Sequence, residues 1–322
     1  MSVIIVNWNS REVLLGCLRS LADYPPAPAW EAIVVDNGSA DGSVAALRAT
    51  YPEVRVIANP DNRGLPAANN QGIAAASGAT LLICNPDVVF QPGAAAALVG
   101  LLGRHERAGM VIPRLHYPDG EVQTSAGDLP TLSEALRGRQ AQRRLVEGAG
   151  GPGGARGAPA GFWWDGWAHD SERVIGRGHE AAYAVRRAAA EEVGPQDEGF
   201  RLDWEGIDWT ARFRDAGWEV WLCPAASVVH LGGASIRQVP FRWVVSSHRG
   251  MYRYFAKRRP AYWRPALALA IGARAVVKLA ATAGGMAMYE RGHRGAARGA
   301  TGATGATGEG RPRGSEGGTF GT

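Results

Sequence analysis

Short apolar runs alternate with helical stretches over the first hundred residues, and this alternation limits the fold more than any other feature of the sequence. The apolar runs are Val3–Val6, Ala32–Asp36, Val54–Ala58 and Thr80–Asn85. The helical stretches between them are about 11–22, 43–50, 65–76 and 93–103. Strands that alternate with helices in this way build βαβ units. The sequence therefore predicts an α/β fold with a Rossmann-like, mostly parallel central sheet and helices on both faces.

The rest of the chain divides by composition. A sequence pattern typical of a globular domain continues to about residue 236. It includes a predicted helix near 206–216 and a predicted strand at Trp218–Cys223. A Gly/Pro-rich loop at about 148–161 interrupts it, and we expect this loop to be mobile. We therefore expect a domain over 1–236, an extension of basic amphipathic helices over 237–290, and a disordered Gly/Ala/Thr-rich tail over 291–322.

The three cysteines indicate a reducing compartment. Cys17, Cys84 and Cys223 lie far apart in apolar runs, a spacing that suits neither a disulfide framework nor a zinc site. The chain opens on a strand-like run without a charged leader, so we expect no secretory signal. Both features predict a cytoplasmic protein.

Positive charge is concentrated near the C-terminal end. Residues 237–299 carry 13 Lys/Arg and one acid, whereas the net charge of the whole chain is +5. Such a segment favours an anionic partner. Its wide apolar faces favour a membrane surface, and no nucleic-acid module is recognisable. We expect peripheral contact with the inner face of the cell membrane and no nucleic-acid binding.

The apolar segment Pro265–Met288 has two interpretations. Arg274 and Lys278 lie near its middle, and two central cations make a membrane-spanning helix costly. One interpretation is an interfacial helix that lies on the bilayer, with aromatic residues such as Tyr262 nearby. The other is a helix packed on the preceding domain, and the sequence leaves both open.

Polar side chains follow the predicted strands at the points where the strands end. They are Asn7 and Asn9 after the first strand, Asp36 after the second, and Asn85 and Asp87 after the fourth. In open α/β sheets ligands bind outside the carboxyl ends of the strands. We therefore expect these side chains to line one site.

The segment Asn85-Pro86-Asp87 is the strongest local signal. Pro86 cannot continue a strand ladder, so the chain turns and leaves Asp87 at the sheet edge. A carboxylate there suits Mg²⁺ or Mn²⁺ that also holds diphosphate oxygens, although an ordinary turn uses the same residues. His230 follows another strand and is a candidate to complete the metal shell, although a single histidine is more often structural.

Two segments have a composition suited to binding a ligand. Small residues in the loop 36–43 allow close approach, and its side-chain oxygens can accept from a base or a ribose; an ordinary N-capping loop is the alternative. Its candidate binding residues are Asp36, Asn37, Ser39 and Asp41. Asn69 and Asn70 lie in mid-helix, where asparagine has poor propensity, and Arg63 adds a cation for a diphosphate or a sugar. The 36–43 loop has neither a dinucleotide motif nor a Walker A lysine.

Two carboxylates, Glu205 and Asp208, lie at the start of the predicted helix 206–216. Acidic residues at a helix N-terminus are favoured by the helix dipole, so capping is one interpretation. The other is a general base that deprotonates a hydroxyl group of a substrate.

In this order and spacing, the segments resemble family 2 glycosyltransferases of the GT-A fold, most closely the rhamnosyltransferase-like group. The resemblance covers about residues 2–260. It rests on Val-Asn-Trp-Asn at 6–9, the 36–43 loop, Asn62-Arg63-Gly64 through Asn70, Asn85-Pro86-Asp87, Ala184-Val185-Arg186-Arg187, and His230 with its Gly-Gly and Ser235. It implies an inverting, metal-dependent transfer of a sugar from a nucleotide-diphosphate donor to a cell-envelope glycan or lipid-linked acceptor. dTDP-rhamnose is the favoured donor, and UDP-linked sugars remain open.

The resemblance also implies roles for individual residues. Asp36 would contact the nucleobase, in a pocket that residues 7–9 also line. Asp87 would be the main metal carboxylate of an Asp-x-Asp-like motif, with Asn85 in its first acidic position. His230 would be a further ligand to the metal or the diphosphate.

The sequence departs from the family pattern at the expected base. The pattern is Glu-Asp-x-Asp at the start of this helix, but here it reads Glu205-Gly206-Ile207-Asp208. Since glycine cannot take a proton, either Glu205 or Asp208 acts as the base, with Glu205 slightly favoured. A further hypothesis gives His179 and Glu180 a role in acceptor choice or as the missing base. The alternative to an active enzyme is a weakened homologue that binds nucleotide sugar in a glycan-assembly complex.

Overall fold

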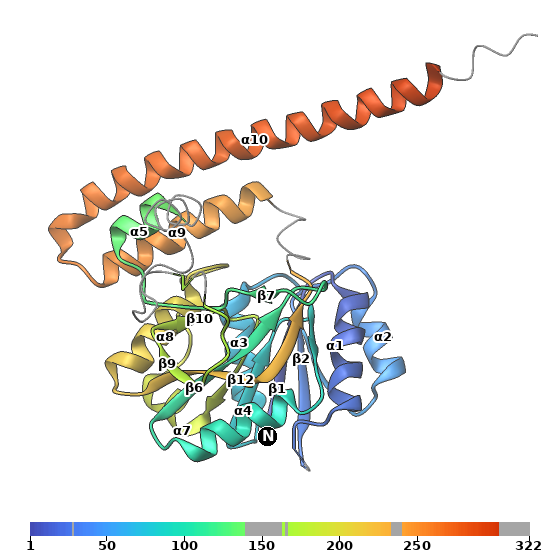
Figure 1. The fold of residues 1–322 in the computed structure, drawn as a ribbon, viewed down its shortest axis with the longest axis vertical. Helices are drawn as coiled ribbons and strands as arrows, with labels where there is room; N and C mark the ends of the chain where they lie inside the picture. The colour runs from blue at the N-terminus through green and yellow to red at the C-terminus, as the bar shows by residue number, and fades with distance from the viewer. Residues whose placement is uncertain (28, 139–162, 165–166, 233–239, 303–322) are drawn as a thin grey trace, which may run out of the picture. The chain divides into compact units, whose positions relative to one another are not determined.

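The computed structural model describes residues 1–27, 29–138, 163–164, 167–232 and 240–302 (Figure 1). The Gly/Pro-rich segment 148–161, Gly233 and Ser235 lie outside the described residues. Contacts divide the chain into two compact units, Met1–Val276 and Val277–Thr322.

Ten strands of the described chain form one mixed sheet in the order β3-β2-β1-β4-β11-β6-β12-β5, with β7 on β6 and β9 on β12. Their bounds are β1 Ser2–Asn7, β2 Glu31–Asp36, β3 Arg55–Ala58, β4 Thr80–Cys84, β5 Val88–Phe90, β6 Ala108–His116, β7 Val122–Gln123, β9 Arg173–Ile175, β11 Ala182–Arg186 and β12 Glu219–His230. β8 (Ala126–Gly127) and β10 (Arg177–Gly178) pair in a small second sheet. β1 to β4 are parallel, whereas β11 runs antiparallel between β4 and β6.

The helices of the described chain alternate with these strands as predicted. Their bounds are α1 Arg11–Asp23, α2 Ser43–Thr50, α3 Leu65–Ala75, α4 Ala94–Arg104, α5 Leu132–Arg137, α7 Arg187–Val193, α8 Glu205–Asp215, α9 Pro240–Lys257 and α10 Arg264–Gly302, with a 3₁₀ turn at Ala261–Trp263. Within the first hundred residues the predicted ends agree with the structure to one residue. β12 is longer than predicted, because it continues past Cys223 to His230.

Each face of the sheet is covered by helices because the central strands are apolar on both sides. Val3 and Ile5 of β1 pack in one cluster with Leu14 of α1 and Leu98 of α4. Ile4, which points to the other face, packs in a second cluster that includes side chains of α8. α3 also contacts β1 and β2. Such two-sided burial is typical of parallel sheets in α/β proteins. All three cysteines are buried, as predicted for residues of the core.

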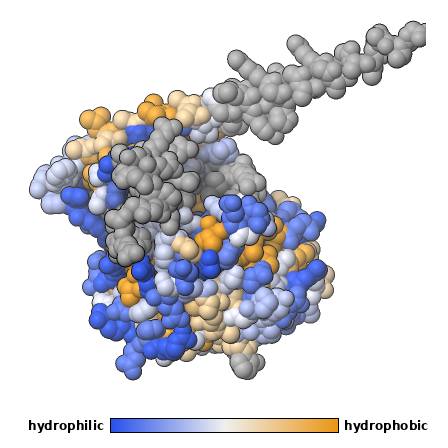
Figure 2. Space-filling model, viewed as in Figure 1, coloured by the Kyte–Doolittle hydropathy of each residue, from blue (hydrophilic) through white to orange (hydrophobic). Residues whose placement is uncertain are grey.

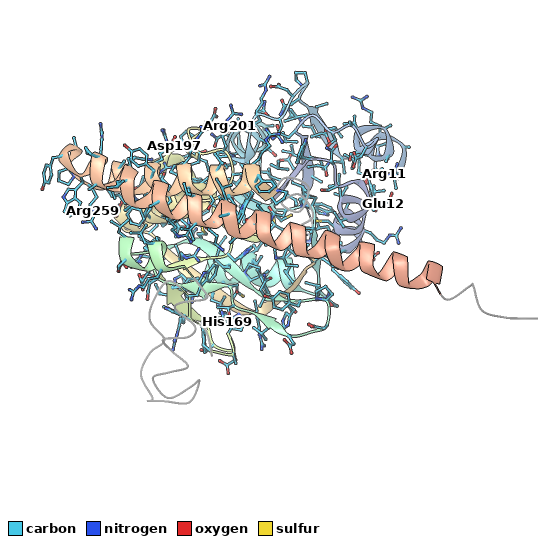
Figure 3. All side chains as sticks on the ribbon, turned by 90° about the horizontal axis from the view of Figure 1, so that it is seen from above. Arg11, Glu12, His169, Asp197, Arg201 and Arg259 are labelled. Carbon is cyan, nitrogen blue, oxygen red and sulfur yellow. The ribbon has the colours of Figure 1, made fainter. Side chains whose placement is uncertain are left out.

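α9 belongs to the same compact unit as the sheet. Its residues Met251, Tyr254 and Phe255 are buried in one cluster with Trp204 and with Ile207 of α8. Asp197, labelled in Figure 3, accepts hydrogen bonds from Arg253 and Lys257 of α9. The domain boundary expected at 236/237 therefore differs from the division at 276/277, because α9 completes a core that residues before 236 leave open.

α10 begins as a packed helix. Leu267 and Ile271 are buried, and Arg274 donates hydrogen bonds to the Leu136 carbonyl and to Nε2 of His248. Among the described helices, one stretch, Ala261–Gly284, is long and apolar enough to cross a membrane by length and composition. The tail was expected from 291, but helical backbone continues to Gly302; residues 303–322 lie outside the described part of the chain.

Candidate active site

The parallel strands bring their polar terminal residues to one edge of the sheet. Asn7 and Asp36 end β1 and β2 and are direct partners in the parallel register. On the other side of β1, Cys84 of β4 pairs with Ile5, which puts Asn85 at the same edge. The backbone N–H of Asn85 donates to the carbonyl of Ala181, so the segment before β11 also reaches this edge.

Asp36 is buried and held by a network of hydrogen bonds. Nδ2 of Asn7 donates to one carboxylate oxygen of Asp36 at 2.9 Å, and the backbone N–H of Ser39 donates to the other at 2.9 Å. The Ser39 hydroxyl in turn accepts from the backbone N–H of Asn9 at 2.9 Å. These bonds fix the loop after β2 against the loop after β1. The structure thus brings together the residues predicted to form the nucleobase pocket.

Other predicted donor-binding residues form hydrogen bonds that hold the neighbouring loops together. Oδ1 of Asn37 accepts from the backbone N–H of Arg63 at 3.0 Å, and Nδ2 of Asn37 donates to the Asn62 side chain at 3.1 Å. Asp41 accepts from the backbone N–H of Arg11 at 2.8 Å and caps the start of α1. The Arg63 side chain is half exposed, with Asp61 at 3.9 Å. Arg63 thus keeps a cation accessible beside the site.

Asn69 and Asn70 join α3 to the loop before α8. Nδ2 of Asn69 donates to Oε1 of Gln196 at 3.0 Å. Asn70 exchanges two hydrogen bonds with the Gln196 backbone and donates a third to Glu198 at 3.0 Å. These contacts explain two asparagines in mid-helix: their amide groups fasten α3 to a distant loop. Asn69 also borders the pocket described below.

Asp87 and His230 face one another. Both are nearly buried, and Oδ1 of Asp87 lies 3.6 Å from Nε2 of His230. The other ring nitrogen, Nδ1, lies 3.1 Å from Oε1 of Gln123 and donates a proton to it in the tautomer that we assign. Burial lowers the pKa of His230, although the Asp87 carboxylate opposes this effect. A neutral imidazole therefore presents its lone pair toward a carboxylate.

This pair has the chemistry of a partial metal shell. Two acceptor groups that face one another are stabilised when they share a cation, and the hydrogen bond to Gln123 fixes the orientation of the imidazole for such a role. Within the described residues, no group of three His, Cys, Asp or Glu side chains is placed to hold a metal. Mg²⁺ and Mn²⁺ commonly take only one or two protein ligands and complete their shell with substrate phosphates and water. Asp87 and His230 fit that mode.

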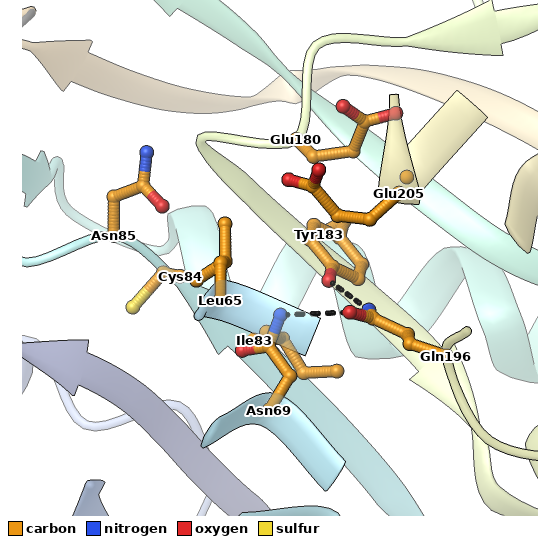
Figure 4. A pocket seen from close by; sticks show the side chains of 10 residues that line it. Leu65, Asn69, Ile83, Cys84, Asn85, Glu180, Tyr183, Gln196 and Glu205 are labelled. Carbon is orange, nitrogen blue, oxygen red and sulfur yellow. Dashed lines mark hydrogen bonds between the residues drawn. The ribbon is translucent and has the colours of Figure 1, made fainter. Parts of the chain in front are cut away.

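A small pocket lies between β4, β11 and the start of α8 (Figure 4). It is lined by Leu65, Asn69, Ile83, Cys84, Asn85, Glu180, Tyr183, Gln196, Glu205 and Gly206. At its floor Gln196 accepts from Asn69 and donates to the Tyr183 hydroxyl at 3.1 Å. Above Tyr183 lie the two carboxyl groups of Glu180 and Glu205. The pocket therefore has hydrogen-bonded amide side chains at its floor and two carboxyl groups above them.

Both acids hold their protons unusually tightly. Burial, followed by the charges of Asp203 and Glu180, raises the pKa of Glu205 to about 8. Burial also raises the pKa of Glu180 to about 7, although the nearby Arg177 guanidinium partly opposes the effect. Carboxyl groups with pKa values near neutrality are suited to general acid–base catalysis.

Asp208, the other predicted base, has a different environment. Its side chain is fully buried and lies between two cations: Nζ of Lys257 is 2.9 Å from Oδ1, and Nε of Arg212 is 3.1 Å from Oδ2. It does not line the pocket. Of the two bases that the sequence left open, Glu205 borders the pocket and Asp208 joins α8 to α9.

Sequence reasoning missed several residues of the site. Tyr183 and Gln196 form the pocket floor, and Gln123 orients His230. A strand tyrosine and isolated polar residues in loops carry no local pattern that predicts these contacts. The Ala184–Arg187 segment also has a plain structural role, since Arg187 donates to the carbonyls of Ala76 and Gly78.

Comparison with known proteins gives consistent matches. Residues 2–158 match the model of glycosyl transferase family 2. The N-acetylglucosaminyl-diphospho-decaprenol L-rhamnosyltransferase of Mycobacterium tuberculosis strain H37Rv is 29% identical over 278 residues, 83% of this chain and 87% of the relative. An uncharacterized Bacillus subtilis glycosyltransferase, YwdF, is 36% identical over 95 residues, 29% of this chain and 34% of its own.

Solved structures share the fold. The mannosyltransferase PcManGT of Pyrobaculum calidifontis, in complex with GDP-Man and Mn²⁺, superposes with a TM-score of 0.51 at 17% identity, over 91% of this chain and 79% of its own. GalNAc-T7 with UDP, GalNAc and Mn²⁺ has a TM-score of 0.50 at 16% identity, over 71% of this chain and 43% of its own. These neighbours confirm the predicted GT-A fold.

Proposed function

We propose, on the premise that this chain is a family 2 glycosyltransferase of the rhamnosyltransferase-like group, that it moves a sugar from a nucleoside-diphosphate donor to a lipid-linked glycan acceptor with inversion at the anomeric carbon. Rhamnose carried by dTDP is the favoured donor, since the mycobacterial relative is an L-rhamnosyltransferase that acts on a diphospho-decaprenol glycolipid. The observation that carries the proposal is the gathering of three groups at one sheet edge. They are the Asn7–Asp36–Ser39 network, the Asp87–His230 pair and the acidic pocket beside Asn85.

The donor would be bound through the first two groups. Carboxylate and hydroxyl oxygens of Asp36 and Ser39 would accept from the nucleobase or ribose, and Arg63 would attract the diphosphate. Asp87 and His230 would hold Mg²⁺ or Mn²⁺, which when bound neutralises charge on the leaving diphosphate. Asn69 and Asn70 would act by keeping α3 in place.

The acceptor hydroxyl would enter the acidic pocket. Its oxygen forms a bond to the anomeric carbon while the bond from that carbon to the diphosphate breaks, and the diphosphate leaves with the electron pair. The hydroxyl proton passes to a carboxylate of the pocket. A single displacement of this kind inverts the anomeric centre.

A lipid-linked acceptor also favours contact with a membrane surface. On the first turns of α10, Leu269 and Val276 are 77% and 67% exposed, on a helix whose other face is packed. Figure 2 shows apolar side chains at the surface in this part of the molecule. Together with the basic residues of 237–299, these side chains fit an anionic bilayer on which the chain lies peripherally.

The direct test is turnover of a panel of dTDP-, UDP- and GDP-linked sugars with a polyprenyl-diphosphate-linked acceptor. We expect Mn²⁺-dependent release of the nucleoside diphosphate from one donor, and a loss of about 10²-fold or more in Asp87→Ala. Glu12→Gln, an exposed change on α1, is the control. Tight metal-dependent donor binding without transfer to any acceptor would instead support the alternative, a nucleotide-sugar-binding homologue.

A further inference from the structure

The glutamate side chain of Glu180 occupies the space that a side chain at position 206 would need. Glu180 lies in the short turn between β10 and β11, and Gly206 lies in the first turn of α8. A Cβ atom built on Gly206 would overlap the carboxyl group of Glu180, including its Cδ atom and Oε1. Position 206 therefore requires glycine as long as Glu180 keeps this conformation, and a carboxylate placed at position 206 would displace Glu180 from it.

The pocket around this contact has the features of a site that awaits a ligand. Glu205 is only 8% exposed and lines the pocket. Among the residues that the structure describes, its Oε2 atom and the buried Oε1 atom of Glu180 have no hydrogen-bond partner. A buried carboxylate oxygen without a partner is costly. A substrate hydroxyl that donates to it would remove that cost.

The groups around the two acids give them different tendencies to ionise. Arg177 of β10 favours the charged form of Glu180, whereas Asp203 opposes it. Glu205 is next to two acids, Asp203 and Glu180, and its pKa is the higher of the two. Burial raises the pKa of the Tyr183 hydroxyl, which lies below the two acids, so this group stays protonated. When the pair loses one proton, Glu180 is the favoured anion and Glu205 the proton donor.

We propose that Glu180 is the base that takes the proton from the acceptor hydroxyl, reaching from the β10–β11 turn into the place left open by Gly206. This inference rests on the proposed transfer reaction. The acceptor O–H proton moves to the Glu180 carboxylate while the acceptor oxygen bonds to the anomeric carbon and the diphosphate leaves. The proton is then released to water. Glu205, protonated, donates a hydrogen bond within the pocket.

The proposal is tested by moving the carboxylate between the two positions. Glu180→Gln keeps the shape of the side chain and should lower kcat by about 10²- to 10⁴-fold with little change in donor affinity. Gly206→Asp alone should also lower kcat, because the new side chain collides with Glu180. Glu180→Ala combined with Gly206→Asp removes the collision and returns a carboxylate to the pocket from α8. This double variant should recover at least about tenfold in kcat over Glu180→Ala.

Donor affinity by calorimetry and melting temperature are measured for every variant, with Glu191→Gln, an exposed change on α7, as the control. Turnover of Glu180→Gln within about threefold of wild type would overturn the proposal, as would a larger loss in Glu205→Gln than in Glu180→Gln. Loss of donor binding together with turnover in Glu180→Gln would equally overturn it, since the residue would then be structural. A wild-type protein that transfers no sugar would instead refute the proposed function itself.

Discussion

At the scale of single residues, two acids one helical turn apart in α8 have opposite environments. Glu205 faces the pocket, and Asp208 is paired with Lys257 and Arg212. The dipole of the helix favours acids at both positions, so sequence alone could not separate them. The difference arises because α9 supplies a lysine to one side of α8 while the β10–β11 turn supplies Glu180 to the other.

Asp208→Asn should therefore act on stability and not on catalysis. It leaves two cations beside a neutral side chain, and we expect unfolding free energy to fall by about 2 kcal/mol, less than for a fully buried pair because Lys257 keeps Asp197 as a partner. kcat should change by less than about threefold. Urea unfolding and turnover measure the two effects. A large loss of kcat without a loss of stability would return Asp208 to the list of candidate bases.

At the scale of elements, α9 packs against the turn that leads into Glu205. This turn, formed by Asp203 and Trp204, is called the corner below. Asp203 and Trp204, directly before α8, both have positive φ angles of 72° and 75°, a conformation that costs free energy in residues other than glycine. Ser247 of α9 donates to the Asp203 carboxylate at 2.6 Å, and Gly250 allows α9 to approach this corner closely. α9 thus stabilises a strained turn beside the pocket.

Gly250→Val should weaken both fold and function. A Cβ atom at position 250 would lie 2.8 Å from the Asp203 carbonyl oxygen and 3.0 Å from Cβ of Trp204, so α9 or the corner must move. We expect a loss of stability of about 1–3 kcal/mol and a fall in kcat of about tenfold or more. Ser247→Ala, which removes one hydrogen bond without a clash, should cost only about 1 kcal/mol. Equal turnover in wild type and Gly250→Val would show that the corner does not control the site.

The first turns of α10 give a second prediction for an element. Leu269→Asp and Val276→Asp place charges on the exposed apolar face and should weaken binding to anionic vesicles by about tenfold or more each. Cosedimentation with vesicles that contain phosphatidylglycerol measures the effect, and neutral vesicles provide the comparison. Gly272→Ala on the same helix has open space for its added methyl group and serves as the matched control. Unchanged binding in both aspartate variants would exclude this face as the contact.

At the scale of the whole molecule, raised and lowered pKa values place the stability maximum at mildly acidic pH. Hydrogen bonds from Ser2 and Ser77 lower the pKa of Glu31 to about 2, and those from Arg253 and Lys257 lower the pKa of Asp197. Their stabilisation is present above the unfolded pKa of about 4 and is lost as pH falls below it. Glu180 and Glu205, with raised values, stabilise the fold below their unfolded pKa of about 4.5. This contribution is lost progressively as pH rises from about 4.5 to the folded pKa values of about 7 and about 8.

The melting temperature without ligands should therefore be highest at about pH 4–5 and fall toward about pH 8 and below about pH 4. Glu205→Gln removes one group that must ionise inside the pocket. We expect it to reduce the loss between about pH 4.5 and about pH 8 and to leave the acid side unchanged. Thermal unfolding across this pH range checks both parts. An identical alkaline slope in wild type and Glu205→Gln would mean that Glu205 does not titrate in the folded protein.

The sequence by itself determined the fold class and the edge of the sheet at which the polar residues after the strands meet. Apolar runs alternating with helical pattern specified parallel strands, and parallel strands bring Asn7, Asp36 and Asn85 to one edge regardless of packing detail. These features are local and periodic, so they can be recognised in a single amino-acid sequence. The sequence also offered His230 as a candidate partner of Asp87, and the structure places the two side chains 3.6 Å apart, while their role as metal ligands stays a prediction.

Tertiary structure alone decided which side chains share a pocket and which are used as scaffold. Asn69 and Asn70 look free in a helix, but they bond to Gln196, more than a hundred residues later in the chain. α9 looks like a separate basic extension, but it packs on α8 and pairs with Asp208. Glu180 reaches the space above Gly206 from the turn that precedes β11, and β11 lies antiparallel beside β4. Contacts between distant segments depend on volume and orientation, which composition and spacing do not encode.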